Sequence, residues 1–283
     1  MTKNRSRFRG IGLWIAVAAV PLLILFFWTQ QNLIQAETVE LRSERLPAAF
    51  DGFRIAIISD LHGKVFVENN DVLLKKVAAL KPDMIAITGD LIEAGEQFAM
   101  VPAVASGLCA IAPTYYVTGN HEWNVRRVPE LKKLLTQCGV TVLTNKFVTL
   151  ERNGQTLVVA GIDDPNGPAD QKTLGELEKE VAAAYQDPFW ILLAHRNDLS
   201  RYDSENCADL VLCGHAHGGL IRLPLIGGLI GTDRQLFPKY TSGVWQTQWD
   251  KQVFISRGLG NAGRTFRLFN RPQLPLVILR TVQ

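Results

Sequence analysis

The segment Leu210–Gly219 reads Leu-Val-Leu-Cys-Gly-His-Ala-His-Gly-Gly, and it decides how the rest of the chain is interpreted. A short apolar run of this kind is typical of a buried strand. A strand that ends in a glycine turn can direct the two histidines that follow, His215 and His217, into a cleft. Imidazole is a common ligand of transition-metal ions. A single pair also fits an ordinary polar loop, so the meaning of this segment depends on the other histidines.

The other histidines of the chain, which has five in total, also follow apolar, β-rich runs. His62, His121 and His195 each lie just beyond the end of such a run. A further run, Met84–Thr88, is followed in the same way by Asp90. Because open α/β sheets bind ligands at the carboxyl ends of their strands, these side chains are expected to meet at one edge. The sequence therefore predicts a metal site built from several strand ends.

A set of short motifs resembles those of the calcineurin-like metallophosphoesterases in both order and spacing. The motifs are Asp60-Leu61-His62, Gly89-Asp90, Gly119-Asn120-His121-Glu122, His195 and Gly214-His215-Ala216-His217. The likeness covers roughly residues 50–283. The membrane-anchored YkuE-like subgroup is the most similar, on the basis of the apolar N-terminus and the stretch from Gly218 to Pro224. The run His195-Arg196-Asn197-Asp198 departs from the many relatives that carry a proline two residues after this histidine.

This resemblance implies a site for two divalent metal ions, for which a mixed nitrogen and oxygen ligand set suits Mn, Fe or Zn. The implied ligands are Asp60, His62 and His217 for the first ion, Asn120, His195 and His215 for the second, and Asp90 as the bridge between them. Two ions about 3.5–4 Å apart clamp a phosphate and share a bridging hydroxide. The implied activity is hydrolysis of a phosphodiester, pyrophosphate or phosphomonoester bond by in-line attack of that hydroxide.

Further residues have expected roles around these ligands. By resemblance, His121 is catalytic and stabilises the transition state or protonates the leaving oxygen, with a structural cap of its turn as the alternative. Glu122, Asp163 and Asp164 are candidates for orienting the ligands, and a solvated loop is their alternative. Arg222 is a candidate contact for a substrate phosphate.

Two functions of different classes are compatible with the motifs. The first is a membrane-anchored dimetal phosphoesterase, and the second is a non-catalytic phosphoesterase fold that serves as a binding platform. Platforms normally arise through loss of ligands, whereas every motif position is filled here, which favours the enzyme. The net charge is only +3, and part of it lies in the first ten residues, so a nucleic-acid partner is not expected. The sequence leaves the substrate and the oligomeric state open.

The N-terminal segment, residues 1–29, is predicted to be a transmembrane signal anchor. Basic residues from Lys3 to Arg9 precede Ile11–Trp28, which carries no charge and would form a helix about 27 Å long. Pro21 is tolerated in membrane helices. A cleaved signal peptide is the rival interpretation, but a good small-residue cleavage site is missing. The positive-inside rule then predicts a single-pass protein of the cell membrane whose catalytic domain lies on the extracytoplasmic side.

The remaining pattern predicts an α/β fold in which two mixed sheets pack face to face with helices outside. Strands and helices alternate first, and hairpins follow, one of them at Asn153-Gly154. Residues 53–283 are expected to form the metallophosphoesterase domain and residues 30–52 a polar stalk leading into it. The four cysteines form no Cys-x-x-Cys pair, so we expect buried thiols, with a disulfide as the alternative in an exported domain.

The stretch Leu220–Gly231 follows the histidine pair directly and carries a single charged residue, Arg222. A loop this apolar is unusual at a surface that faces water. One interpretation tucks its leucines and isoleucines under the domain as a small core. The other rests the loop on the bilayer, so that the site faces lipid headgroups. The second interpretation favours a lipid phosphodiester or a lipid-linked pyrophosphate, such as a nucleotide-sugar lipid, as the substrate.

Overall fold

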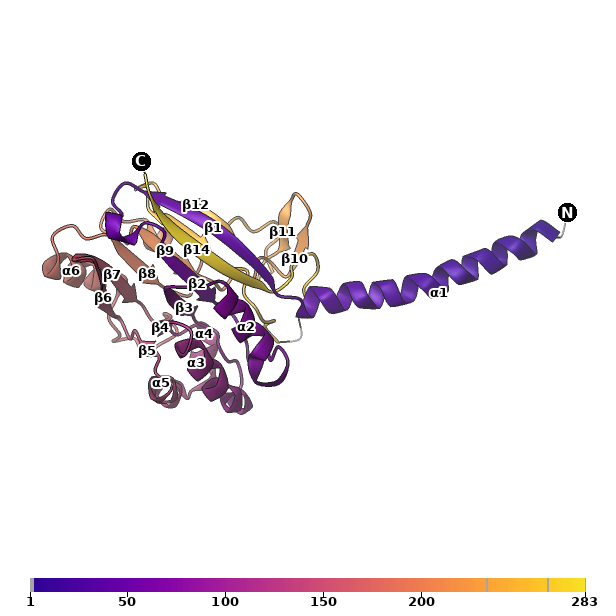
Figure 1. Ribbon diagram of the computed structural model, residues 1–283, viewed down its shortest axis with the longest axis horizontal. Helices are drawn as coiled ribbons and strands as arrows, with labels where there is room; N and C mark the ends of the chain where they lie inside the picture. The colour runs from indigo at the N-terminus through magenta and orange to yellow at the C-terminus, as the bar shows by residue number, and fades with distance from the viewer. Residues whose placement is uncertain (1–2, 233, 264, 283) are drawn as a thin grey trace.

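The strands of the protein form two six-stranded sheets and a separate two-stranded hairpin. The computed structural model describes residues 3–232, 234–263 and 265–282, and the surroundings of side chains from residue 17 onward. Within these residues the two large sheets stack face to face, and helices cover their outer surfaces (Figure 1). The predicted architecture of two packed mixed sheets flanked by helices is therefore confirmed.

The first sheet consists of β1 (Gln35–Ser43), β2 (Arg54–Ile58), β3 (Met84–Thr88), β4 (Thr114–Val117), β5 (Thr141–Val142) and β14 (Gln273–Thr281). Their order in space is β1-β14-β2-β3-β4-β5. The strands from β2 to β5 run parallel, β14 is antiparallel to β2, and β1 is parallel to β14. The carboxyl ends of β2, β3 and β4 therefore lie at the same edge.

The second sheet consists of β6 (Lys146–Arg152), β7 (Gln155–Gly161), β8 (Trp190–Leu193), β9 (Leu210–Cys213), β12 (Gly243–Gln246) and β13 (Gln252–Ile255). Their order is β12-β13-β9-β8-β7-β6, with parallel pairing from β13 to β7 and an antiparallel strand at each edge. Outside both sheets, the hairpin pairs β10 (Ile221–Leu223) with β11 (Gly227–Ile230).

The helices that cover the sheets are α2 (Asp71–Ala79), α3 (Val101–Cys109), α4 (Asn120–Val125), α5 (Val128–Gln137) and α6 (Leu174–Ala184). Short 3₁₀ turns lie at Ala48–Phe50, Glu68–Asn70, Gly95–Met100 and Leu199–Tyr202. α2, α3 and α5 pack on the first sheet, and α6 packs on the second. The four cysteines are all free, so the disulfide alternative is wrong.

The apolar alternation within each strand explains the layers. In β2, Ile55 and Ile57 join the core between the two sheets, whereas Ile58 points to the helices on the other face. Leu73 and Val77, one turn apart in α2, meet that outer face. Each such side chain contributes about 1.5–3 kcal/mol through removal from water. The two sheets are thereby held in a fixed relation, which the site at their edge requires.

The segment predicted as a stalk, residues 30–52, is in part a strand of the first sheet. β1 pairs with β14 along its whole length, from Gln35 opposite Gln273 to Ser43 opposite Thr281. Some inward positions of β1 carry polar side chains, so the sequence lacks the apolar pattern that usually predicts a strand. Glu37 is accommodated there because it forms an ion pair with Arg257 at 3.0 Å. The stalk prediction is therefore wrong for residues 35–43.

The N-terminal segment forms a single helix, α1 (Lys3–Asn32), which includes Pro21 and projects away from the body (Figure 1). Apolar side chains such as Leu22 and Ile24 are exposed along it. In the part of the chain that the structure describes, no helix combines the length and the apolar character needed to cross a bilayer. The side chains of the basic residues from Lys3 to Arg9 lie outside the described part.

Candidate metal centre

The carboxyl ends of strands from both sheets deliver the predicted ligands to one place. From the first sheet, Asp60 and His62 follow β2, Asp90 follows β3, and Asn120 follows β4 at the start of α4. Backbone hydrogen bonds tie these loops together, since the His62 N–H donates to the Asp90 carbonyl at 2.9 Å. From the second sheet come His195, His215 and His217, which follow β8 and β9.

Several of these ligands lie in the left-handed region of backbone conformation, which is rare for residues other than glycine. The φ angles are 50° at Asp60, 48° at His62, 51° at Asp90, 67° at His215 and 51° at His217. Backbone strain of this kind persists only where the surrounding structure enforces it, and it clusters at functional sites. The turns after β2, β3 and β9 are thus shaped to direct their ligands inward.

Gly214 shows how tightly the loops approach one another. A Cβ atom at this position would lie 1.9 Å from Ser59 Oγ and 2.3 Å from Asp60 Oδ2. Non-bonded atoms do not approach each other this closely. The glycine before the histidine pair is therefore required by the approach of the β9 loop to the β2 loop. This contact places the ligands of both sheets side by side.

The first ligand group consists of Asp60, His62 and His217, whose ligand atoms lie within 4.8 Å of one another. The two histidines bring their Nε2 atoms to 3.1 Å, and His217 Nε2 lies 3.5 Å from Asp60 Oδ1. All three residues are buried. Burial first, and then the neighbouring His62, hold the pKa of His217 well below its usual range. A neutral imidazole with a free lone pair is the form that binds a metal ion.

The second ligand group consists of Asp90, His195 and His215, with Asn120 beside it. His195 Nε2 lies 3.2 Å from Asp90 Oδ2 and 3.1 Å from both Asn120 Oδ1 and His215 Nδ1. His195 Nδ1 is 2.9 Å from the Thr88 carbonyl, and donation to that oxygen leaves Nε2 facing the group. Both the donor types and their convergence fit a divalent cation.

Asp90 lies between the two groups. Its Oδ2 atom is 3.7 Å from His62 Nε2 and 3.2 Å from His195 Nε2, so one carboxylate reaches a ligand of each group. Burial favours the neutral form of Asp90, but the neighbouring histidines, first His195, hold the pKa of this carboxyl far below its usual range. An ionised carboxylate in this position matches the bridge implied by the motifs.

His121 lies at the mouth of the site and is only partly buried. Its ring meets the ring of His62 edge to face, with centroids 4.8 Å apart, and its Nε2 atom is 4.0 Å from Asp90 Oδ2. Burial is the main reason that the pKa of His121 is lowered. His121 also belongs to a third possible ligand group, with His62 and Glu93, and its partial exposure leaves the ring accessible to a substrate.

The carboxylates predicted to orient the ligands are buried and hydrogen-bonded, which contradicts the alternative of a solvated loop. Glu122 accepts hydrogen bonds from the backbone N–H groups of Asp90 at 3.0 Å and Gly119 at 2.7 Å, and so joins the β3 and β4 loops. Asp163 accepts from the Thr118 hydroxyl at 2.8 Å. Asp164, described below, holds an arginine beside the ligands.

Two residues near the ligands were not predicted from the sequence, Glu93 and Arg196. Glu93 Oε2 lies 3.1 Å from His62 Nδ1 and 3.9 Å from His121 Nδ1. A carboxylate behind a ligand histidine fixes the ring and raises its basicity. The only signal in the sequence is that Glu93 follows Asp90 within the same loop. Arg196 lies in the run His195-Arg196-Asn197-Asp198, which departs from the family pattern at Asn197, and it had no predicted role.

Arg222 is held by the loop that follows the histidine pair. Its Nη1 atom donates to the Gly218 carbonyl at 2.8 Å and to the Ser242 hydroxyl at 3.0 Å. Its side chain lines a cleft of about 550 Å³ together with Gln30 at the end of α1 and residues of the β10–β11 hairpin. Contact between Arg222 and the phosphate at the metal centre therefore stays a prediction.

A sequence profile of the calcineurin-like phosphoesterases matches residues 53–219. The chain belongs to the calcineurin-like phosphoesterase family. Members of this family hydrolyse phosphoesters with a dimetal centre, and the two ligand groups here fit such a centre. The protein is accordingly a metal-dependent phosphoester hydrolase, and the enzyme interpretation is confirmed over the binding platform.

Relatives within the calcineurin-like phosphoesterases agree with this assignment. The metallophosphoesterase YkuE of Bacillus subtilis is 28% identical over 263 residues, which cover 90% of this chain and 88% of YkuE. The phosphodiesterase YaeI of Escherichia coli is 28% identical over 235 residues, which cover 80% of this chain and 82% of YaeI. A bovine transmembrane protein with a metallophosphoesterase domain is 30% identical over 86% of this chain, which spans 56% of that protein.

Solved structures show the same fold at low sequence identity. The NAD nucleotidase of Haemophilus influenzae superposes with a TM-score of 0.51 at 17% identity, over 74% of this chain and 45% of that protein. The sulfate thiohydrolase SoxB of Thermus thermophilus also superposes with a TM-score of 0.51, at 13% identity, over 83% of this chain and 57% of the SoxB chain. At these identities the likeness concerns the fold alone.

Proposed function

We propose that the protein is a membrane-anchored phosphoesterase that hydrolyses a phosphodiester or pyrophosphate bond in a lipid-linked substrate. Metal-dependent phosphoester hydrolysis follows from the family. The membrane part rests on one observation, namely that apolar side chains are exposed both along α1 and at the tip of the β10–β11 hairpin. Exposed apolar surface of this extent marks an interaction site on a soluble body.

The chemistry divides between the bound cations and the side chains. When bound, the two cations supply an activated water at neutral pH and neutralise charge on the phosphoryl oxygens. Asp60, Asp90, Asn120 and the ligand histidines would hold them. His121, at the mouth, is placed to donate a hydrogen bond to an oxygen of the substrate as charge develops there. Glu122 keeps the Asp90 loop and the Asn120 turn in register during the reaction.

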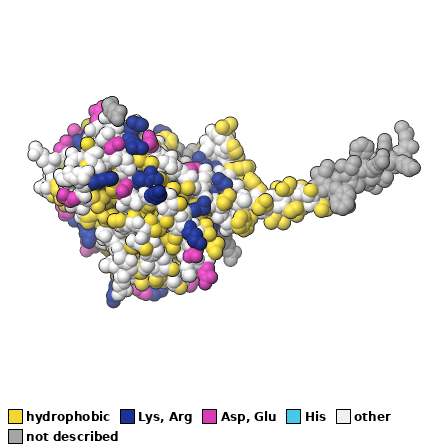
Figure 2. Space-filling view, in the orientation of Figure 1, with side chains coloured by type: hydrophobic (Ala, Val, Ile, Leu, Met, Phe, Trp, Pro, Cys, Tyr) yellow, Lys and Arg dark blue, Asp and Glu magenta, His cyan; other side chains and the backbone are white. Residues whose placement is uncertain are grey.

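The base of α1 and the hairpin line the same cleft. Figure 2 shows hydrophobic side chains along the described part of α1 and on the projecting β10–β11 hairpin beside it, which Figure 1 labels. Phe26 of α1 contacts Phe269, with ring centroids 5.5 Å apart, and Gln31 donates to the Arg267 carbonyl at 2.7 Å. These contacts fix the helix to the body, so a bilayer that holds α1 would also meet the hairpin.

The tip of the hairpin is exposed, so the interpretation of this stretch as a small core is wrong for Leu225 and Ile226. Leu225 is fully exposed, and Ile226 is 63% exposed. Behind the tip, Arg222 and Arg271 line the cleft of about 550 Å³. Basic groups just behind an apolar tip are suited to the anionic headgroups of a bilayer surface. Arg222 is thus proposed to contact a phosphate of the lipid substrate.

The proposed location is the extracytoplasmic face of the cell membrane. The basic residues at the start of the chain favour a cytoplasmic N-terminus, which leaves the body on the other side. The bovine relative named as a transmembrane protein is consistent with anchoring. The name of the YaeI relative supports a phosphodiester as the bond that is cleaved.

The test compares two substrates and two variants of the full chain with added Mn²⁺. One substrate is a soluble aryl phosphodiester, and the other is a phospholipid presented in vesicles. The change of Leu225 and Ile226 together to Ser should leave cleavage of the soluble ester within about twofold, and lower vesicle activity at least about tenfold, because apolar contact is lost. The control is Val244→Ser, which alters an exposed apolar residue of β12.

The outcomes separate docking of the hairpin, anchoring to the membrane and hydrolysis. Equal vesicle activity in the hairpin variant would contradict docking of the hairpin on the bilayer. Wild-type protein that remains in solution when vesicles float would contradict anchoring. Lack of cleavage of the soluble ester, with two metal ions bound per chain, would contradict the hydrolase itself.

A further inference from the structure

Gln31, in the last turn of α1, holds both backbone polar groups of Arg267. The Gln31 Nε2 atom donates to the Arg267 carbonyl at 2.7 Å, and its Oε1 atom accepts from the Arg267 N–H at 3.1 Å. The same Oε1 atom accepts from Asn261 Nδ2 at 2.9 Å. Asn261 and Arg267 belong to one loop, residues 258–263 and 265–270, which we call the backing loop. The end of α1 is therefore hydrogen-bonded to this loop at two residues.

Arg267 organises the backing loop from within. Its side chain is buried, and its Nε and Nη2 atoms donate to the Gly260 carbonyl at 3.0 and 2.5 Å. Its Nη1 atom donates to the Asn270 carbonyl at 3.3 Å. A guanidinium presents its donors in a fixed planar fork, so the carbonyls bound to it cannot move independently. Since Gln31 holds the backbone of the same residue, the end of α1 helps to set the position of the whole loop.

The backing loop supports two ligands of the first group through their backbones. The Gly260 N–H donates to the Asp60 carbonyl at 2.7 Å. Asn270 Nδ2 donates to the His217 carbonyl at 2.6 Å. The loop approaches so closely that a Cβ atom at Gly258 would lie 2.6 Å from Asp60 Cβ. A displacement of the loop would therefore move the two ligands relative to each other.

The third ligand of this group, His62, is reached from the same loop through Glu93. The Gly263 N–H donates to Glu93 Oε2 at 3.0 Å, and that oxygen lies 3.1 Å from His62 Nδ1. Lys64, two residues after His62, donates through Nζ to the Gln31 carbonyl. Each ligand of the first group is thus supported by the backing loop, directly or through one side chain.

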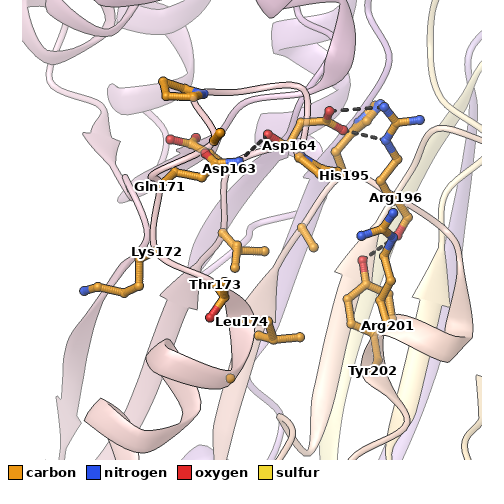
Figure 3. Close-up of a pocket in the computed structure, with 16 residues that line it drawn as sticks. Asp163, Asp164, Gln171, Lys172, Thr173, Leu174, His195, Arg196, Arg201 and Tyr202 are labelled. Atoms are coloured by element: carbon orange, nitrogen blue, oxygen red, sulfur yellow. Dashed lines mark hydrogen bonds and ion pairs between the residues drawn. The ribbon is translucent and has the colours of Figure 1, made fainter.

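The second ligand group is held by other parts of the chain. Arg196, which follows the ligand His195, donates to both oxygens of Asp164 at 2.6 and 3.1 Å (Figure 3). Its Nη1 atom lies 3.1 Å from Nε2 of His215. Among the residues that the structure describes, no hydrogen bond joins the backing loop to Asp90, Asn120, His195 or His215. The support from α1 is therefore directed to the first metal site.

We propose that Gln31 is a positioning residue for the first metal site, so that the end of α1 is a working part of this site. With Gln31 in place, the backing loop holds the three ligands in the geometry that a cation needs, which such sites require to within about 0.5 Å. Without Gln31 the loop is free to shift, and the first cation binds more weakly. Separation of α1 from the body would accordingly leave a protein deficient in one metal ion. The inference concerns the metal centre and does not depend on a bilayer around α1.

The test measures Zn²⁺ binding to the full chain by competition with a chromophoric chelator. Gln31→Leu keeps the size of the side chain but removes its hydrogen bonds to the backing loop. One of the two ions should bind at least about fivefold more weakly, and the other should stay within about twofold of the wild type, because partners behind metal ligands set their affinity. Asn32→Leu is the control, since this exposed neighbour bonds only within α1, to the Trp28 carbonyl at 3.0 Å.

A second variant acts on the backing loop without touching α1. Asn270→Leu removes the donor to the His217 carbonyl and should weaken the same ion by about tenfold. Because both changes act through one loop, Gln31→Leu combined with Asn270→Leu should cost less affinity than the product of the two separate losses. A combined loss equal to that product would overturn the route through the backing loop.

Hydrogen exchange of the metal-free proteins supplies a readout without any cation. The Gly260 amide should exchange at least about fivefold faster in Gln31→Leu than in the wild type, because the loop opens more readily. Unchanged affinity for both ions in Gln31→Leu would overturn the inference. Equal weakening of both ions, together with a lower midpoint of urea unfolding, would show a general structural role and would overturn it as well.

Discussion

His62 and His217 bring their Nε2 atoms to within 3.1 Å of each other, although 155 residues separate them in the chain. Their rings stack with centroids 4.9 Å apart. Two ring nitrogens that face each other at this distance are both satisfied when one cation accepts their lone pairs. The first metal site therefore depends on the orientation of both rings, and the orientation of the His62 ring depends on Glu93.

Glu93→Gln is expected to weaken binding of the first cation. The amide keeps the size of the side chain but removes the negative charge that lies 3.1 Å from His62 Nδ1. Loss of such a partner behind a ligand histidine costs about 10–100-fold in metal affinity. Zn²⁺ affinity is measured by competition with a chromophoric chelator, and Glu96→Gln, in the 3₁₀ turn that follows, is the control. An unchanged affinity would show that Glu93 does not position His62.

Asp90→Asn is expected to lower activity on a soluble aryl phosphodiester by at least about a hundredfold, which corresponds to about 2.7 kcal/mol. The reason is that one carboxylate reaches ligands of both groups, at 3.7 and 3.2 Å, and the change removes its charge. Metal content should also fall. Asp250→Asn, in an exposed turn with a φ of 56°, is the matched control. Near-wild-type turnover with both ions retained would rule out the bridging role.

His121→Ala is expected to lower turnover while metal content stays near that of the wild type. The ring lies at the mouth of the site, with Nε2 4.0 Å from Asp90 Oδ2, and is not needed to complete either predicted ligand set. A loss of about 10²–10⁴-fold in kcat is typical for a general acid or base. The measurements are steady-state kinetics and metal analysis on the same preparation. Loss of one ion per chain would show instead that His121 is a ligand.

Gly214→Ala is expected to destabilise the fold by about 1–3 kcal/mol or more, as overpacking of a tight interior does. The added Cβ would lie 1.9 Å from Ser59 Oγ, so the two loops that carry ligands would have to separate. Gly175→Ala is the control, because it lies in α6 with open space around the added atom. Urea denaturation measures both. Equal midpoints for Gly214→Ala and the wild type would contradict the close approach of these loops.

The predicted ligands could be found from the sequence because each one follows a strongly apolar strand. Strands of this kind are apolar on both faces, and their carboxyl ends share one edge in a parallel arrangement. The convergence of Asp60, Asp90 and His195 could therefore be predicted without knowing the conformation of the loops. The motif spacing then adds His215 and His217, which the same argument places beside them.

What the sequence does not predict depends on contacts between distant segments. β1 has polar residues on its inward face, and Glu37 becomes compatible with a sheet only because Arg257 lies opposite. The partners of Glu93 and Arg196 are likewise set by how the loops meet, since a carboxylate or guanidinium carries no pattern of its own. Whether α1 crosses a bilayer stays a prediction, because its contacts with the body, such as those of Phe26 and Gln31, lie near the end of the helix and do not depend on a membrane.

The pairing of β1 with β14 also constrains how the protein is made. In the first sheet β1 has β14 as its neighbour, and β14 separates it from β2. During synthesis, residues 35–43 leave the ribosome long before residues 273–281 and have no strand to pair with until those residues follow. The pairing of β1, the strand that joins α1 to the body, is therefore completed last. Until then, a nascent chain held by α1 would expose an unpaired strand to chaperones and proteases.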